Sequence, residues 1–340
     1  MKNYRIIAAV LSAVILCGCA AQPADTSSEV NTPESSASQQ TGESSAVTSP
    51  PENGENSEYV PGERDENGVY VADGYASKLN YPLDEKSVTY AASRFELVYE
   101  EYLKDSGSSV YVSVIPDKNY FLAEKNGFPS LDYSALTGTL TENMPFAEYI
   151  DIFPMLELSD YYRTDTHWKQ ENITDIAAHI ASVMGVTLSA EYTLNELPEP
   201  FYGVHCRQAD ISVEPDKLVY LESGFMSDCT VYDAETESYT DIYNMELAAG
   251  KDPYEIFLSG AKSLLTIENP NATTEKELII FRDSFGSSIA PLFAEGYSKV
   301  TLVDIRYLSP KLLGMFVDFH GQDVLFLYST LVLNNSVTIK

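Results

Sequence analysis

The stretch Leu278-Ile279-Ile280-Phe281-Arg282-Asp283-Ser284-Phe285-Gly286 decides the fold class of this chain. Its first four residues form an apolar run, which predicts a strand that is buried on both faces. A turn is expected from Arg282 to Gly286, and residues 287–297 are expected to form a helix. Ligands of parallel sheets bind beyond the carboxyl ends of strands, so Ser284 stands where a functional residue is expected.

The segments around this stretch continue the alternation of strands and helices. The pattern predicts strands at residues 110–115, 149–152, 264–267, 300–303 and 324–327, and helices at residues 85–104, 173–184 and 310–318. Such an order predicts an α/β fold in which a central, mostly parallel sheet lies between two helical layers. Residues 188–245 instead show short alternating segments, which we interpret as a small antiparallel β insertion packed against the main sheet.

The beginning of the chain has the layout of a secretory signal. Lys2 and Arg5 precede an apolar run at residues 6–16, which is too short to span a membrane, and Leu16-Cys17-Gly18-Cys19 follows. This ending resembles a bacterial lipobox, so we expect residues 1–19 to be a lipoprotein signal peptide and Cys19 to carry the lipid. An ordinary signal peptide cleaved nearby is the alternative.

The following segment and the overall charge restrict the possible partners. Residues 20–65 are rich in Ser, Thr, Pro and Glu and are expected to be a disordered tether, which leaves residues 66–340 as the folded domain. The chain has 51 acidic and 21 basic residues, for a net charge of −30. This charge argues against nucleic acid and anionic membrane surfaces as partners. We expect a domain held by its lipid anchor at the extracytoplasmic face of the cell membrane.

A second stretch, Tyr161-Tyr162-Arg163-Thr164-Asp165-Thr166-His167-Trp168, carries the chemistry that Ser284 lacks. A serine hydroxyl becomes a nucleophile when a base accepts its proton, and the base needs a partner that fixes its tautomer. His167 and Asp165 suit these two roles, with a backbone N–H of Ser284 or its neighbour as the oxyanion donor. Alternatively, Asp165 and Ser284 cap helices and His167 is a packed or solvent-facing histidine. Metal binding by Asp165 and His167 is a further alternative, but no second histidine stands close by, and we expect neither a metal nor a cofactor.

Five other residues are candidates for lesser roles. Arg163, Tyr162 and Arg306 are candidate substrate-binding residues, although either arginine could instead form a structural ion pair. Cys206 and Cys229 could form a disulfide in an oxidising compartment or remain as two free thiols.

The motifs resemble those of the bacterial DHHW family. The resemblance rests on Tyr161 to Trp168 and on Arg282 to Phe285, and it is supported by Val114-Ile115-Pro116-Asp117-Lys118 and Val303-Asp304-Ile305-Arg306-Tyr307. The family is related to the SGNH-hydrolase-like proteins of alginate O-acetylation, so the resemblance implies a three-layer SGNH-hydrolase-like domain. It also implies Asp165, His167 and Ser284 as orienting acid, base and nucleophile. Thr166 replaces the first histidine of the family's name, and the Asp-x-His pair is retained.

Three functions are compatible with these residues. The leading hypothesis is a tethered O-acetyltransferase that acts on a cell-surface or secreted polysaccharide, with a membrane-bound O-acyltransferase as the partner that supplies acyl groups. The second is a carbohydrate acetylesterase with the same triad, in which water replaces the sugar. The third is a non-catalytic lipoprotein that binds glycan or supports an assembly.

Overall fold

The computed structural model of the chain describes residues 67–208 and 211–340. The expected signal peptide with Cys19 and the expected tether lie outside the described residues. The largest feature is an eight-stranded sheet with the order β4-β3-β12-β10-β11-β9-β7-β8. Its strands are β3 (Ser109–Ile115), β4 (Glu148–Tyr149), β7 (Thr230–Asp233), β8 (Ser238–Thr240), β9 (Leu264–Glu268), β10 (Glu277–Arg282), β11 (Lys299–Val303) and β12 (Asp323–Ser329). Strands β4, β3, β12, β10 and β11 are parallel, as the sequence predicts.

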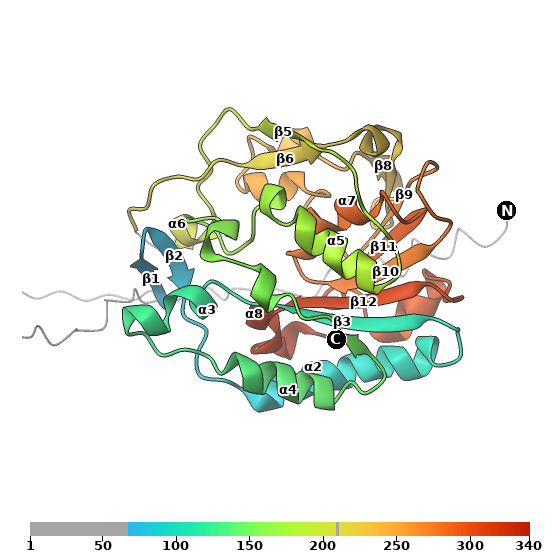
Figure 1. Cartoon of the computed structure of the whole chain (residues 1–340), viewed down its shortest axis with the longest axis horizontal. Helices are drawn as coiled ribbons and strands as arrows, with labels where there is room; N and C mark the ends of the chain where they lie inside the picture. The colour runs from blue at the N-terminus through green and yellow to red at the C-terminus, as the bar shows by residue number, and fades with distance from the viewer. Residues whose placement is uncertain (1–66, 209–210) are drawn as a thin grey trace, which may run out of the picture. The chain divides into compact units, whose positions relative to one another are not determined.

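Strand β10 shows why the sheet is covered on both faces. Successive side chains of a strand point to opposite faces, and here Leu278 and Ile280 enter one hydrophobic core while Ile279 and Phe281 enter another. The first core contains α5 (Thr174–Val183) and α7 (Gly286–Phe293). The second contains α2 (Glu85–Val98) and α4 (Tyr133–Glu142). The result is the predicted three-layer arrangement, with α2 and α4 on one side of the sheet and α5 and α7 on the other (Figure 1).

The remaining elements are short and lie mostly in the connections. The other α-helices are α3 (Asn119–Leu122), α6 (Val204–Gln208) and α8 (Thr330–Leu333), and a π-helix, η1 (Tyr99–Leu103), extends α2. Two small antiparallel sheets pair β1 (Val69–Ala72) with β2 (Tyr75–Lys78) and β5 (Thr193–Glu196) with β6 (Val219–Glu222). Within the described part of the chain, no helix is long and apolar enough to cross a membrane.

The predicted insertion at residues 188–245 is antiparallel, but it does not form one separate unit. Only β5 and β6 make a sheet of their own, whereas β7 and β8 continue the main sheet through β9, which is antiparallel to β11. An edge strand exposes unpaired N–H and C=O groups that favour such an extension. The insertion therefore partly extends the sheet on which it was expected to pack.

Some boundaries also differ from the prediction. Of residues 149–152 only Tyr149 belongs to a strand, because Ile150 and Ile152 turn into the core as the chain leaves the sheet. Residues 310–315 form a 3-10 helix, η9 (Pro310–Met315), instead of an α-helix. Neither difference changes the position of the parallel strands.

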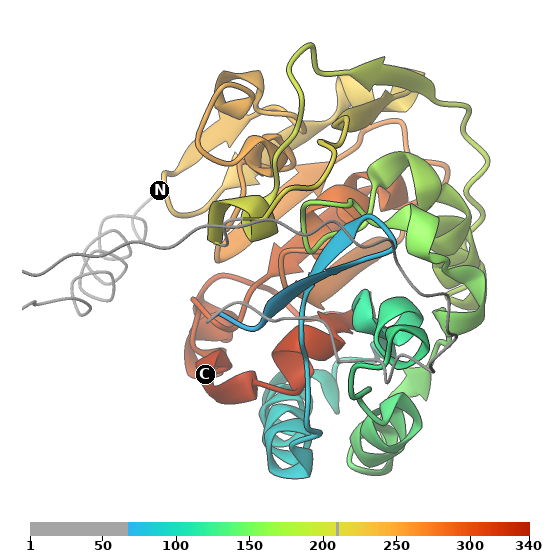
Figure 2. The ribbon, with the colours of Figure 1, turned by 90° about the vertical axis from the view of Figure 1, so that its left-hand side faces the viewer.

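The carboxyl ends of the parallel strands gather at one edge of the sheet. Strand β3 leads to α3, β12 leads to α8, and β10 leads to the turn that contains Ser284. Figure 2 looks onto this side, where β1 and β2 also lie. The turn predicted to carry the nucleophile is therefore at the edge where ligands of parallel sheets bind.

Candidate active site

The turn that carries Ser284 is held by its own neighbours. The Asp283 carboxylate accepts the N–H of Phe285 at 3.0 Å and the N–H of Ser329, which ends β12, at 2.8 Å. Gly286 is required here, because a Cβ at this position would lie 2.7 Å from the Cβ of Arg282. Asp283 thus orders the turn, and the Ser284 side chain remains partly exposed.

The Asp165–His167 segment forms a tight loop between Tyr161 and Trp168. These two residues form an isolated antiparallel bridge, and the N–H of Tyr162 donates to the carbonyl of His167 at 3.1 Å. The buried Trp168 indole N–H donates to Ser288 Oγ of α7 at 2.9 Å. This bond ties the loop to the helix that follows the Ser284 turn.

The structure brings Ser284, His167 and Asp165 into one hydrogen-bonded chain. Ser284 Oγ lies 2.7 Å from His167 Nε2, and His167 Nδ1 lies 2.6 Å from Asp165 Oδ1. A carboxylate only accepts hydrogen bonds, so Nδ1 carries the proton and a neutral imidazole presents Nε2 as an acceptor. The serine hydroxyl can then donate to Nε2, as a general base requires.

The surroundings of Asp165 keep it ionised. Its side chain is 1% exposed, and its Oδ2 accepts the N–H of Val204 at 2.7 Å. Burial by itself would raise the pKa of Asp165, but the electrostatic interaction with the adjacent His167 ring and the hydrogen bonds from His167 and Val204 outweigh it and hold the pKa well below the usual range. Asp165 therefore orients the imidazole and does not cap the helix after the loop.

Two buried charged residues brace the same loop. The Asp216 carboxylate accepts the N–H groups of Arg163 and Thr164, both at 2.8 Å. On the other side of the peptide group between Tyr162 and Arg163, Lys118 Nζ donates to the carbonyl of Tyr162 at 2.9 Å and also to that of Ala76. Lys118 is fully buried, and this burial lowers its pKa to about 7 even though the Asp165 and Asp216 carboxylates act to raise it.

Close packing also holds the His167 and Asp165 side chains in place. The Tyr254 ring stacks on His167 with centroids 3.9 Å apart and an interplanar angle of 7°. Gly203 lies directly against the backbone and side chain of Asp165, where a Cβ would not fit. His205, two residues further on, is buried, and burial together with the charge of Lys118 lowers its pKa to about 3, so it stays neutral.

One backbone N–H remains available to an oxyanion. Phe285 N–H is engaged by Asp283, and Gly286 N–H donates to the Asp283 carbonyl at 3.1 Å. Among the described residues, the N–H of Ser284 has no acceptor. Of the two donors proposed from the sequence, Ser284 itself is thus the one left free.

The other predicted substrate residues have different surroundings. Arg163 is exposed beside the loop. Tyr162 is completely buried against Phe201, with ring centroids 5.0 Å apart, so it packs in the core and has no surface to offer a substrate. Arg306 makes a forked ion pair with Asp304, with distances of 2.7 and 2.9 Å, and this pair occupies its guanidinium.

Cys206 and Cys229 are both free thiols in the structure, so the alternative of a disulfide is not realised there. Burial raises the pKa of Cys229 to about 12. In the described part of the chain, no group of three or more His, Cys, Asp or Glu side chains is placed to hold a metal.

The residues that support the Asp165–His167 loop were not predicted from the sequence. Lys118 stands in a motif that contributed only to the resemblance, and Asp216, Gly203 and Tyr254 lie 38 to 89 residues after Asp165 in the chain. A lysine that stands three residues after the end of a buried strand was a usable signal, because residues at that position lie at the edge where ligands of parallel sheets bind. The other three had no local signal.

The fold of the chain matches that of known proteins, although its sequence does not. No protein-family model matches the chain, and no curated protein matches it in sequence. The crystal structure of a DHHW family protein from Eubacterium siraeum matches with a TM-score of 0.64 and 23% identity, and the match covers 81% of this chain and 95% of that one. The chain shares its fold with a DHHW family protein.

Two structures of Bacillus cereus PatB1 match as well. One, solved with a sulfonyl adduct, has a TM-score of 0.61 and 19% identity over 78% of this chain and 95% of that one. The other has a TM-score of 0.57 and 17% identity over 78% and 96%. The predicted resemblance to DHHW proteins is confirmed in the fold.

Proposed function

We propose that the chain is an O-acetyltransferase of a cell-surface or secreted polysaccharide, with Ser284 as nucleophile, His167 as general base and acid, and Asp165 as orienting carboxylate. The observation that carries the proposal is the continuous hydrogen-bonded chain from Ser284 Oγ through His167 to Asp165. Residues 117 positions apart meet at hydrogen-bond distance, and the site already has the geometry that nucleophilic catalysis needs.

The reaction proceeds in two acyl transfers. Ser284 Oγ attacks the carbonyl carbon of an acetyl donor while its proton passes to His167 Nε2. The tetrahedral oxyanion faces the free N–H of Ser284, and its collapse breaks the bond to the donor oxygen, which takes the proton from His167. A sugar hydroxyl then gives its proton to Nε2 and attacks the carbonyl carbon of the acetyl-serine. The bond to Ser284 Oγ breaks, and this oxygen takes the proton back from Nε2.

The setting expected from the sequence supports this assignment. A lipid on Cys19 and a tether at residues 20–65 would hold the domain near the extracytoplasmic face of the cell membrane. We propose that a membrane-bound O-acyltransferase partner delivers the acyl group there and that the acidic domain meets a glycan that is not itself acidic. The shared fold with DHHW proteins and PatB1 is compatible with this chemistry.

The central test is acylation of Ser284. The full chain is incubated with a chromogenic acetyl ester or a sulfonyl fluoride, and the modified peptide is located by mass spectrometry. We expect an adduct on Ser284 that is lost in Ser284→Ala and strongly reduced in His167→Ala. Ser287→Ala, a matched change of a buried serine three residues away, should keep it.

The acceptor decides between transferase and esterase. With oligosaccharide present, a transferase yields acetylated sugar, whereas an esterase yields acetate alone at an unchanged rate. No adduct on Ser284, together with unchanged polysaccharide acetylation in cells that carry Ser284→Ala, would refute the proposal and leave the non-catalytic role.

A further inference from the structure

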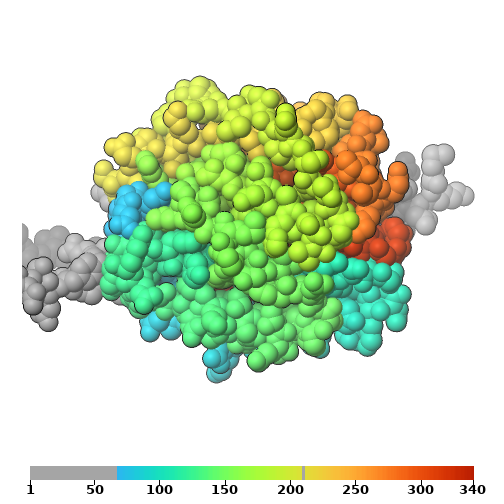
Figure 3. All heavy atoms as spheres, in the orientation of Figure 1, coloured from blue at the N-terminus to red at the C-terminus, as the bar shows by residue number. Residues whose placement is uncertain are grey.

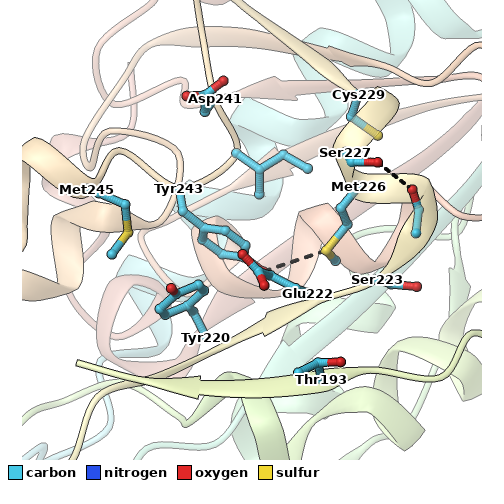
Figure 4. A pocket seen from close by; sticks show the side chains of 12 residues that line it. Thr193, Tyr220, Glu222, Ser223, Met226, Ser227, Cys229, Asp241, Tyr243 and Met245 are labelled. Atoms are coloured by element: carbon cyan, nitrogen blue, oxygen red, sulfur yellow. Dashed lines mark hydrogen bonds between the residues drawn. The ribbon is translucent and has the colours of Figure 1, made fainter. Parts of the chain in front are cut away.

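The insertion contains an open pocket that the triad does not line. It has a volume of about 570 Å³ and lies between β6, the 3-10 helix η6 (Gly224–Asp228) and residues 241–245 (Figure 4). We call the part of it that Tyr220, Glu222, Asp241 and Tyr243 form the tyrosine pocket. Figure 3 shows the outer surface of the segments that build this region of the molecule. The volume is within the range that holds a small ligand or a sugar unit.

Two tyrosine rings form an apolar wall of the pocket. Tyr220 and Tyr243 have ring centroids 5.0 Å apart at an interplanar angle of 54°, and both rings are partly exposed. The Tyr243 hydroxyl donates to the carbonyl of Leu221 and is 3.0 Å from Gln170 Oε1. Because this hydroxyl is engaged inside the protein, Tyr243 is fixed before any ligand arrives and presents its ring to the pocket (Figure 4).

The charged side chains that line the pocket are both carboxylates, those of Glu222 and Asp241. Glu222 accepts from Asn195 Nδ2 at 2.9 Å, and Asp241 is exposed. Among the described residues, no lysine, arginine or histidine lines the pocket. A ligand with a positive charge is therefore favoured, whereas a uronic acid or a phosphate would meet two carboxylates with no cationic side chain of the described residues beside them.

These features together specify a ligand with an apolar face and a cationic donor. We propose that the tyrosine pocket binds a hexosamine unit that has a free, protonated amino group. The C–H face of the pyranose ring packs on the tyrosine rings, and the ammonium and the hydroxyl groups face the carboxylates of Glu222 and Asp241. That this sugar belongs to the acetylated glycan rests on the proposed function, whereas the binding itself does not.

The pocket is connected to the candidate active site by one buried side chain. Gln170 stands three residues after His167. Its Oε1 accepts the N–H of Leu221 at 2.9 Å and lies 3.0 Å from Tyr243 Oη. Its Nε2 donates to the carbonyl of Ser288 in α7 at 2.7 Å. Both the pocket wall and the helix behind Ser284 are thus positioned by the same amide. This link couples the position of the pocket wall to that of the helix behind Ser284.

The test is calorimetric binding of three oligosaccharides to the full chain. The probes are a glucosamine tetramer, its N-acetylated counterpart and a galacturonate tetramer. We expect the glucosamine tetramer to bind at least tenfold more tightly than the N-acetylated tetramer, and the galacturonate tetramer to show no binding. Tyr220→Ala and Asp241→Asn should each weaken binding of the glucosamine tetramer at least fivefold.

An acidic protein can attract a cationic oligomer anywhere on its surface, so the control has to match the charge. Asp318→Asn removes the same charge at a side chain that is 94% exposed, outside the pocket, and should leave the affinity unchanged. Tyr220→Ala would also weaken binding if it failed to fold. Glu222→Gln and Asp241→Asn keep the shape of the pocket, so they test the inference independently of Tyr220→Ala. Equal affinities of Asp241→Asn and Asp318→Asn, or of the three probes, would overturn the inference.

The binding test and the acylation test of Ser284 can succeed or fail independently of each other. Ser284→Ala should bind the glucosamine tetramer like the native chain, and Asp241→Asn should still be acylated at Ser284. Binding without any acylation would refute the transferase alone, and acylation without binding would refute the tyrosine pocket alone.

Discussion

The two halves of the candidate active site are held in different ways. The Ser284 turn is fixed by Asp283 and Gly286, its immediate neighbours, and by one contact to the adjacent strand end at Ser329. The Asp165–His167 loop depends on groups from distant segments, among them Asp216, Lys118 and the N–H of Val204. The nucleophile is positioned locally, and the acid–base pair is positioned by tertiary contacts.

This difference has a consequence for how each half fails. A local turn forms whenever its strand and helix form. Substitutions there should therefore lower stability and activity to a similar extent. A loop held from several sides can lose its geometry while the rest of the fold persists. Substitutions in the two halves should therefore separate activity from stability.

The largest effect is expected for Asp165→Asn. The asparagine oxygen would keep the bond from Val204 N–H, which turns the amide N–H₂ toward His167 and favours the tautomer protonated at Nε2. That imidazole cannot accept the Ser284 proton, so kcat for acetyl-ester cleavage should fall by about 10³–10⁴-fold. Steady-state kinetics check this, with circular dichroism to show an intact fold; a fall of less than tenfold would contradict the assigned role.

The next effect is a pH dependence of stability caused by Lys118. Its pKa is about 7 in the folded protein, against an ordinary value of 10.5, so the unfolded chain binds more protons between these two values. The free energy of unfolding should then rise from pH 7 to about pH 10.5 relative to Lys118→Met, by on the order of a few kcal/mol. Below pH 7 the difference between the two proteins should be constant.

Urea unfolding at several pH values measures this contribution. Lys217→Met is the matched control, because the Lys217 side chain is 73% exposed and should give no such slope relative to the native chain. Parallel pH curves for the native chain and Lys118→Met would show that Lys118 stays protonated in the fold.

Gly203→Ala should damage the acid–base loop by sterics alone. The added methyl group meets the backbone and Cβ of Asp165, which have no flexible end that could move away. We expect a loss of about 1–3 kcal/mol of stability and a larger loss of activity than stability explains. Gly138→Ala in α4 is the matched control, since nothing lies within 4 Å of its added Cβ and a helical alanine is stabilising by about 0.5–1 kcal/mol.

The smallest effect is expected on the side of the nucleophile. Asp283→Asn leaves one side-chain oxygen for the two N–H groups of Phe285 and Ser329, so one buried N–H loses its acceptor. The cost should be about 1–2 kcal/mol in thermal or urea unfolding. Activity should fall less than in Gly203→Ala; the reverse order would contradict the distinction between the two halves.

The sequence predicted the layers of the fold well because their signal is local. Apolar runs of four residues, such as 278–281, and helical repeats such as that of α5 report burial directly, and their alternation implies a parallel sheet. The antiparallel edge of the main sheet was harder to predict from the sequence. Whether β7 and β8 join the main sheet depends on pairing with β9, which no property of their own residues encodes.

The chemistry divides in the same manner. The order of residue types already shows that a serine follows a buried strand and that an acid and a histidine stand two residues apart. The folded domain is needed to show that His167 Nε2 lies 2.7 Å from Ser284 Oγ, that Lys118 is buried beneath the loop, and that Tyr162 belongs to the core. Local residue types report what a side chain can do, whereas distances across 117 residues depend on the packing of the whole domain.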